Sequence, residues 1–321
     1  ALPGMQRLTR RAFIGLVEAR PHEKGHVLPH ERTFAEPKAD RMALLEAARA
    51  HFGMCFLLYE GKGAVQDSLA AAAAKAAPIA EFSLPDGTSH RIVAVEDPAA
   101  IAGARRFIAD RTCFIADGHH RYETQIAFRR DHEKTQDWRP SYAYRLAAFV
   151  DVADPGLVIL PTHRLLPKGV TPERFAAAAR PWLQVVMPGE QGARFLVYAG
   201  GVWIALDPRP DLDLARELPE VPAPVRRLDV TILHRLVLER GLGIDTGAKE
   251  HALGYIRSAK DGRAKVDAGE HGGLVVLRPT LVQDVLAVAE SGAVMPQKST
   301  DFYPKLLTGL IMNDIEDDFH G

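Results

Sequence analysis

Cysteine is scarce in this chain, long hydrophobic runs are absent, and neither sign of charge is in excess. Only two cysteines occur among the 321 residues, and Cys55 and Cys113 each stand inside an apolar run. Neither has neighbours at a metal-ligand or redox-motif spacing, so we expect two buried thiols in a reducing compartment. The apolar runs are shorter than a membrane span and no secretory signal opens the sequence. The expected location is therefore the cytoplasm, with no membrane partner.

The charge balance argues against a nucleic-acid partner. Lys plus Arg (40) nearly cancels Asp plus Glu (41), which leaves a formal net charge of −1. Proteins that bind the phosphate backbone usually carry a basic excess or a basic face. The nearest candidate, Arg7 with Arg10 and Arg11, is interpreted as a solvated chain end. The composition is compatible with a homodimer.

The apolar pattern predicts a mixed α/β (α+β) architecture. Apolar residues make up 47% of the chain and charged residues 25%, which is typical of a globular protein. Strands are expected over residues 13–17, 54–59, 79–84, 90–95, 112–116, 141–152, 156–160, 195–198, 202–206 and 273–277. Helices are expected over residues 37–52, 65–77, 122–132, 172–180, 226–240 and 279–290, and another is expected to begin at Asp97-Pro98, with Asp97 as its N-cap. We expect one domain over 1–150 and a second α/β part over 151–321, with 208–224 as a linker-like segment.

The turn after the strand at 112–116 carries the strongest functional signal. Asp117 and Gly118 lie between this strand and a predicted helix, a layout that points the free amides of the helix start outward. Gly118 allows a positive φ and a close approach of the backbone to a ligand. Arg121 adds a fork of donors suited to phosphate oxygens, and Asp117 could hold Mg²⁺ or orient a histidine. The pattern predicts a phosphate-binding turn.

Two structural alternatives exist for this turn. Asp117 could be an ordinary helix N-cap, with His119 and His120 as surface residues. The histidines could instead bind zinc, but they are adjacent and point to different sides, and no third ligand stands at a recognisable spacing. The phosphate-binding interpretation is favoured.

Four blocks of the sequence resemble a known family. They are Val27-Leu28-Pro29-His30-Glu31, then Ala116-Asp117-Gly118-His119-His120-Arg121-Tyr122-Glu123-Thr124, then Leu228-Asp229-Val230 with Leu233-His234, and last Met295-Pro296-Gln297-Lys298-Ser299-Thr300. On these residues the chain is identified as a member of family 1015 of the domain-of-unknown-function series. Family members extend further at the N-terminus, and this chain begins at Ala1, so an upstream segment is expected to be missing.

The same blocks are similar to the free-serine kinases of archaea, in the ParB/sulfiredoxin-like superfamily. That resemblance implies a nucleotide-binding core of this type over 1–150, with Glu31 as general base. It implies that Asp117 and His120 are catalytic, that Asp117 binds Mg²⁺, and that nucleotide contacts come from His30, Gly118, His119 and Arg121. It implies substrate contacts from a loop over 295–310, through Lys298, Ser299, Thr300 and Tyr303.

The residues themselves are compatible with these roles, although each has a structural alternative. Lys298, Ser299 and Thr300 together suit a small carboxylate, but they could form an ordinary polar turn. Glu31 could be a solvated loop acid, and His30 could be a structural hydrogen-bonding residue. Two departures from the kinase pattern stand out. Glu31 and Asp117 are 86 positions apart, which implies an insertion, and Phe302 replaces a substrate-contacting histidine.

The leading functional hypothesis is therefore a phosphotransferase with an alcohol acceptor. It would use ATP or ADP with Mg²⁺ and phosphorylate the hydroxyl of a small hydroxy-amino acid, with serine as the favoured substrate. The alternative is a nucleotide-gated, ParB-like binding or switch protein without turnover. A sulfiredoxin-type redox enzyme is disfavoured, because its reactive cysteine would lie in the turn, where this chain has His119 and His120.

Overall fold

The computed structural model describes residues 7–74, 76–187, 192–247 and 253–316. The chain divides into two units, one formed by residues 1–158 with 302–321 and the other by residues 159–301. This division differs from the expected split because the last segment returns to the first unit. There Phe302 is completely buried and its ring lies against those of His30 and Phe56. The loop expected over 295–310 is thereby shared between the units.

The first unit is built on a five-stranded mixed sheet in the order β1-β8-β4-β7-β2. The pairs β1–β8 and β4–β7 are antiparallel, whereas β4–β8 and β2–β7 are parallel. Two small sheets, β5–β6 and β3–β17, complete it. The elements are β1 (Phe13–Glu18), η1 (His22–Lys24), β2 (Val27–Leu28), α1 (Ala35–Ala48), β3 (Ala50–His51), β4 (Cys55–Tyr59), α2 (Ala64–Ala73), β5 (Pro78–Ser83), β6 (Ser89–Val93), α3 (Pro98–Ala109), β7 (Cys113–Asp117), α4 (His119–His132), η2 (Pro140–Ala143), β8 (Tyr144–Asp151), β16 (Phe302–Tyr303) and β17 (Asn313–Asp314).

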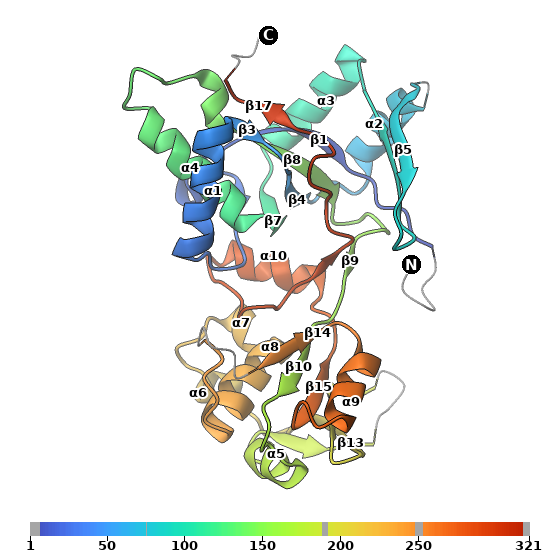
Figure 1. The fold of residues 1–321 in the computed structure, drawn as a ribbon, viewed down its shortest axis with the longest axis vertical. Coiled ribbons are helices and arrows are strands. Elements are labelled where there is room, and N and C mark those ends of the chain that lie inside the picture. Colours follow the sequence, from blue (N-terminus) through green and yellow to red (C-terminus); the bar gives the residue numbers. More distant parts are fainter. Residues whose placement is uncertain (1–6, 75, 188–191, 248–252, 317–321) are drawn as a thin grey trace. The chain divides into compact units, whose positions relative to one another are not determined.

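The central strands of this sheet are buried on both faces, as their continuous apolar runs predict. All five residues of β4 are buried, and its neighbour β7 is buried up to Ala116. The helices α1 and α4 pack side by side (Figure 1). The thiols of Cys55 and Cys113 are free and buried in the core, as predicted. Burial raises the pKa of Cys113 to about 12, so this thiol is chemically quiet.

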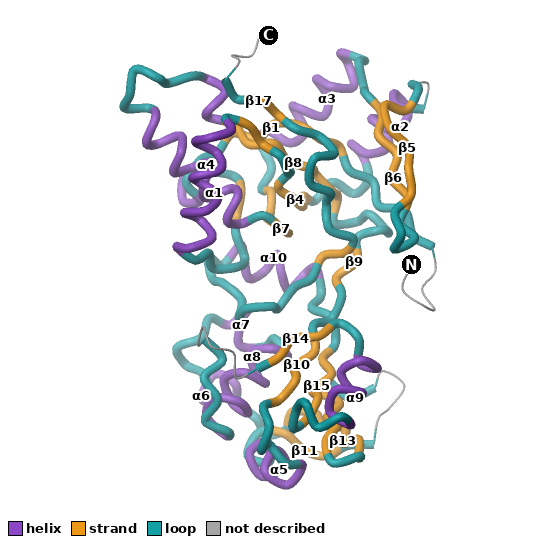
Figure 2. Tube along the Cα trace, viewed as in Figure 1, coloured by secondary structure: helices purple, strands orange, loops and turns teal. Residues whose placement is uncertain are grey.

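The second unit contains a six-stranded antiparallel sheet in the order β11-β13-β12-β15-β10-β14. Its helix α9 lies against β10 and β15 (Figure 2). After β9 (Val158–Ile159), the elements are β10 (His163–Leu166), α5 (Pro172–Ala179), β11 (Leu183–Val185), β12 (Phe195–Ala199), β13 (Val202–Pro208), α6 (Leu214–Glu217), α7 (Ala223–Arg226), α8 (Asp229–Thr231), η3 (Ile232–Gly241), β14 (Gly254–Ile256), α9 (Ala259–Asp267), β15 (Gly273–Leu277) and α10 (Val282–Glu290).

The mixed α/β class is confirmed, and three local predictions need correction. The segment 208–224 is not a linker, because it holds the end of β13 and the short helices α6 and α7. The helix expected over 226–240 begins only at Asp229 and continues as a π-helix from Ile232. The helix expected from 122 begins at His119. The predicted helix over 65–77 is α2, and residue 75 lies outside the described residues. None of the described helices has the length and hydropathy to span a membrane.

Candidate functional site

The predicted turn lies at the junction of β7 and α4. Gly118 has φ 100° and ψ 25° and directly precedes the first residue of α4, His119. The N-cap residue is this glycine, which has no side chain to cap the helix, so the amides of the first turn can offer their positive partial charge to another acceptor. A Cβ at residue 118 would lie 2.9 Å from Arg121 Nε and 3.0 Å from its Nη2. The backbone angle therefore favours glycine, and any side chain at this position would displace the Arg121 guanidinium.

The side chain of Arg121 turns back over Gly118 towards Asp117. Its Nη2 donates to Asp117 Oδ2 at 2.6 Å, and Lys305 Nζ contacts the other carboxylate oxygen at 3.1 Å. Lys305 comes from the C-terminal segment that returns to the first unit. Asp117 is thus held by two cations, and the N-cap alternative is wrong because the N-cap residue of α4 is Gly118.

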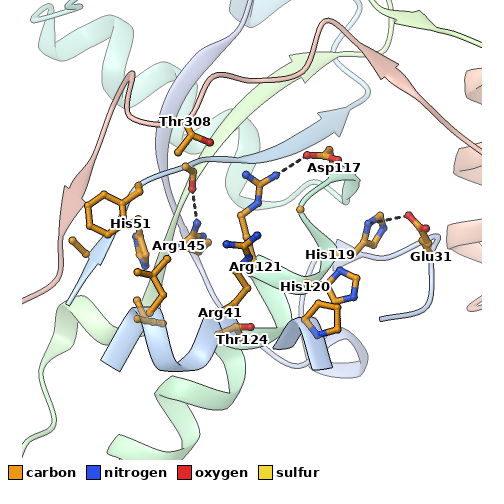
Figure 3. A pocket seen from close by; sticks show the side chains of 17 residues that line it. Glu31, Arg41, His51, Asp117, His119, His120, Arg121, Thr124, Arg145 and Thr308 are labelled. Carbon is orange, nitrogen blue, oxygen red and sulfur yellow. Dashed lines mark hydrogen bonds and ion pairs between the residues drawn. The ribbon is translucent and has the colours of Figure 1, made fainter. Parts of the chain in front are cut away.

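A cavity of about 430 Å³ opens beside this turn, within the first unit. Figure 3 shows Arg121, Arg41 and Arg145 in its middle, and Glu31 with His119 at one edge. The lining residues are Glu31, Pro37, Arg41, Leu44, Leu45, Ala50, His51, Phe52, Gly53, Asp117, Gly118, His119, His120, Arg121, Thr124, Arg145 and Thr308. The polar groups come from α1, β3, the end of β7, α4 and β8, and from loops between elements.

Two buried polar groups of this cavity lack partners among the residues that the structure describes. They are Nε of Arg145 and Oγ1 of Thr124. Arg145 is only 5% exposed, its Nη2 donates to the carbonyl of Gly53, and no carboxylate of the described chain pairs with it. A buried cation without a counter-ion is costly, and its burial lowers the pKa of Arg145. The arrangement therefore suits an anionic ligand that would supply the missing charge and acceptor.

The paired histidines of the turn serve different partners. His119 is buried and its Nε2 accepts a hydrogen bond from the backbone amide of His30 at 3.3 Å. Its Nδ1 lies 3.9 Å from Glu31 Oε2. Burial is the main cause that lowers the pKa of His30 to about 4 and holds that of His119 well below its ordinary value. Both rings are neutral at pH 7, and His119 Nδ1 therefore carries the proton that faces Glu31.

His120 faces the loop before α1 instead. Its Nε2 accepts from the backbone amide of Phe34 at 3.0 Å, and the two rings stack. Partial burial lowers the pKa of His120, which favours the neutral ring. Because Nε2 accepts a hydrogen bond, the proton of the neutral ring is on Nδ1. The zinc alternative gains no support, because the described residues contain no group of three or more His, Cys, Asp or Glu placed to hold a metal ion.

The structure brings part of the predicted site together. Glu31 and the turn residues 117–121 line the same cavity, and His30 packs edge-on against His119, at a ring distance of 4.7 Å. Lys298, Ser299 and Thr300 belong to the second unit, whereas Tyr303 belongs to the first and lies in β16. Lys298 and Ser299 line a separate cavity of the second unit, which is described below.

Sequence reasoning missed several residues of the cavity, among them Arg41, His51, Gly53 and Arg145. His51 is buried and hydrogen-bonds Gln125 at 2.7 Å, and burial lowers its pKa to about 3. The sequence did offer a signal for Arg145, since it is a charge near the start of a strand whose next five residues are apolar. Gly53 carried none, because its closeness to Arg121 Nη1 depends on the tertiary fold.

Solved structures similar to this chain are distant from it. A free serine kinase in complex with AMP is 12% identical, over 99% of this chain and 98% of that one, with a TM-score of 0.48. A conserved hypothetical protein from Pyrococcus furiosus is 12% identical over 97% and 99%, with a TM-score of 0.45. SbnI with a C-terminal truncation, from Staphylococcus aureus, is 14% identical over 94% and 87%, with a TM-score of 0.48. None of the curated proteins matches the chain.

One family profile matches most of the sequence. It is described as "Protein of unknown function (DUF1015)" and covers residues 3–231. That range includes the Pro-His-Glu block, the Gly118 turn and the Leu228-Asp229-Val230 block. The chain belongs to this family, DUF1015.

Proposed function

We propose that the protein is a small-molecule kinase that transfers a phosphoryl group from ATP or ADP to the hydroxyl of a free, serine-like amino acid. The observation that carries the proposal is the cavity beside Gly118. In it, the amides at the start of α4, Arg121 and a buried Arg145, which pairs with no carboxylate of the described residues, surround a space that Glu31 lines at its edge. Phosphoryl transfer needs positioned phosphates, neutralised charge and an acceptor for the hydroxyl proton.

The nucleotide's phosphates are the ligands best suited to the turn. Backbone amides at a helix start bind phosphate oxygens, and a guanidinium offers them parallel donors. His120 can donate from Nδ1, since Phe34 already occupies its Nε2. His30 and His119 stay neutral and shape the wall behind the turn. The order of the Pro-His-Glu, Asp-Gly-His-His-Arg and Lys-Ser-Thr blocks along the chain agrees with that of the free-serine kinases.

Asp117 suits Mg²⁺ as a single carboxylate ligand. Mg²⁺ in such sites commonly takes one or two carboxylates, substrate phosphates and water. Both Asp117 oxygens contact cations in the present structure, at Arg121 and at Lys305. The Lys305 side chain is 45% exposed, and a bound metal ion would have to displace its ammonium from one Asp117 oxygen. A bound Mg²⁺ would supply neutralising charge to the phosphates.

The proton transfer falls to Glu31. Its carboxylate would accept the proton of the acceptor hydroxyl as that oxygen forms a bond to the terminal phosphorus. The bond from phosphorus to the bridging oxygen breaks, and the electron pair leaves with the shortened nucleotide. His119 Nδ1, which carries a proton and lies 3.9 Å from Glu31 Oε2, can orient the carboxylate. Arg121 and Arg145 would stabilise charge on the transferring group.

The acceptor's carboxylate is assigned to Lys298, Ser299 and Thr300, with Tyr303 as a further substrate contact. An ammonium with two hydroxyls matches the charge and hydrogen-bonding capacity of a small carboxylate. Lys298 has a positive φ of 56°, unusual for lysine, and exposed side-chain atoms. This assignment rests on the chemistry of the side chains and on the motif.

The direct test is incubation of the chain with ATP or ADP, Mg²⁺ and a panel of hydroxy-amino acids, followed by mass spectrometry. We expect a phosphorylated serine-like product. A protein that binds nucleotide but phosphorylates no member of the panel contradicts the kinase proposal and supports the nucleotide-gated switch.

A further inference from the structure

The second unit contains a cavity of its own, which the proposed nucleotide site does not include. It measures about 440 Å³ and lies wholly within residues 162–299. Five cationic side chains and two carboxylates line it, together with leucine, valine and proline. Its charged members are Arg164, Arg194, Arg227, Arg278, Lys298, Asp229 and Asp284.

Both carboxylates already have partners. Asp229 pairs with Arg194, whose Nε donates to it at 2.6 Å, and Asp284 lies 3.3 Å from Arg227 Nη2. Arg278 donates to the backbone carbonyls of residues 192 and 193. The wall of the cavity therefore keeps an excess of positive charge.

Arg164 is the centre of this excess. It is 1% exposed, yet no carboxylate of the described chain pairs with it. Its Nε donates to His234 Nε2 at 3.0 Å, and its Nη atoms donate to the carbonyls of Thr162, Gln297 and Lys298. Burial lowers the pKa of Arg164 to about 10, so the group stays charged at neutral pH. The acceptors of Arg164 are all neutral, so its buried positive charge is not balanced by them and would be stabilised by a nearby anion.

The start of α10 adds donors to the same wall. Leu281 precedes this nine-residue helix and provides no side-chain cap, so the first amides are unsatisfied from that side. Thr280 and Leu281 line the cavity. Thr280 Oγ1 donates to the carbonyl of Ser299, which fixes the helix start to the loop that carries Lys298.

We propose that this cavity is a binding site for a small molecule that carries a doubly charged oxyanion, either a phosphate ester or a dicarboxylate. The anion would lie against Arg164, Arg278 and the start of α10, and the apolar wall would contact its carbon skeleton. The proposal does not depend on the nucleotide or on kinase activity. Lys298 and Ser299 also line the cavity, so the variants below avoid them.

The test is thermal unfolding of the full chain at pH 8 and constant ionic strength, titrated with inorganic phosphate or with succinate. We expect a saturable rise of the unfolding midpoint with at least one of them, and the stronger response identifies the class of ligand. Arg278→Gln should raise the half-saturating concentration at least tenfold, and Arg164→Gln should abolish the response. Arg278 is exposed, so its replacement tests the site even where Arg164→Gln fails to fold.

The matched control is Arg235→Gln. Arg235 is an exposed arginine of the same unit, paired with Glu239 at 2.9 Å, and it does not line the cavity. It should respond as the unaltered chain does. An equal response in Arg278→Gln and in Arg235→Gln, or no response of the unaltered chain to either anion, would overturn the proposal. AMP binding by the same proteins tests the proposed function separately. All three substitutions lie in the second unit, so the first unit is unchanged in every variant.

Discussion

Glu31 is the residue on which the proposed chemistry depends most. Replacement by Gln keeps the size and polarity of the side chain but removes the base, so turnover should fall by roughly 10²- to 10⁴-fold. The nucleotide dissociation constant should change little, since the phosphates are assigned to the turn. Steady-state kinetics and calorimetry on the same sample separate the two effects. Turnover that survives Glu31→Gln would remove this residue as the base.

Gly118 is the residue on which the shape of the turn depends. Ala at this position meets both a left-handed backbone and the guanidinium of Arg121, 2.9 Å from the new Cβ. We expect a loss of about 1–3 kcal/mol in the free energy of unfolding, with nucleotide affinity at least tenfold weaker as Arg121 is displaced.

Gly169→Ala provides the matched control. Gly169 has φ 88° but nothing within 4 Å of an added Cβ, so it carries the backbone strain without the collision. Gly169→Ala should lower the free energy of unfolding and leave the nucleotide dissociation constant unchanged. If both variants bind nucleotide equally well, Gly118 does not shape a phosphate site.

Individual residues also mark where sequence reasoning stops. The turn was predictable because Asp117, Gly118 and Arg121 are neighbours in the chain. Arg145 and Gly53 were not assigned to it, since their closeness arises from strand β8 pairing with β4, and β4 with β7. That order is not consecutive in the chain, and the sequence does not encode it in any local pattern.

At the scale of elements, capping signals were reliable. Asp97 accepts hydrogen bonds from the amides of Ala99 and Ala100, and Pro98 occupies the first position of α3, as predicted. Helix α9 was missed, although Ser258 caps it, because it is polar on most positions and only Gly262 is buried. The π-helix after Thr231 could not be predicted, since its wide turn depends on tertiary packing.

The cap of α3 gives a stability prediction. Asp97→Ala removes the acceptor of two otherwise unsatisfied amides and should lower the free energy of unfolding by about 1 kcal/mol. Asp97→Asn retains an acceptor and should lie close to the unaltered chain. Urea denaturation of the three proteins measures the difference, and equal stability of the Ala and Asn variants would contradict the capping role.

At the scale of the whole molecule, buried neutral histidines link stability to pH. Burial lowers the pKa of His30 and His163 to about 4, and that of His51 and His234 to about 3. In the unfolded chain these groups take up protons from about pH 6.5 downward, and in the folded chain only below about 4. The unfolded state therefore binds more protons in this window, and the free energy of unfolding falls as the pH falls.

Denaturation at pH 7.5 and pH 5.5 measures this effect without much titration of carboxylates. Each of the four histidines should cost about 1 kcal/mol over that interval. His51→Gln, which can still hydrogen-bond Gln125, should reduce the pH dependence by the share of one histidine, about 1 kcal/mol. Stability that is flat across the interval would show that these rings titrate normally in the folded protein.

The central claim is that the Gly118 turn binds a nucleotide through its phosphates, and calorimetric titration with ADP and Mg²⁺ tests it most directly. The account predicts saturable binding of one ADP per chain, weakened by about tenfold to hundredfold in Arg121→Gln and in Arg145→Gln, since each removes a charge-assisted hydrogen bond. Arg235→Gln, in the other unit, should bind as the unaltered chain does. Absence of binding, or equal affinity in all four proteins, would contradict it.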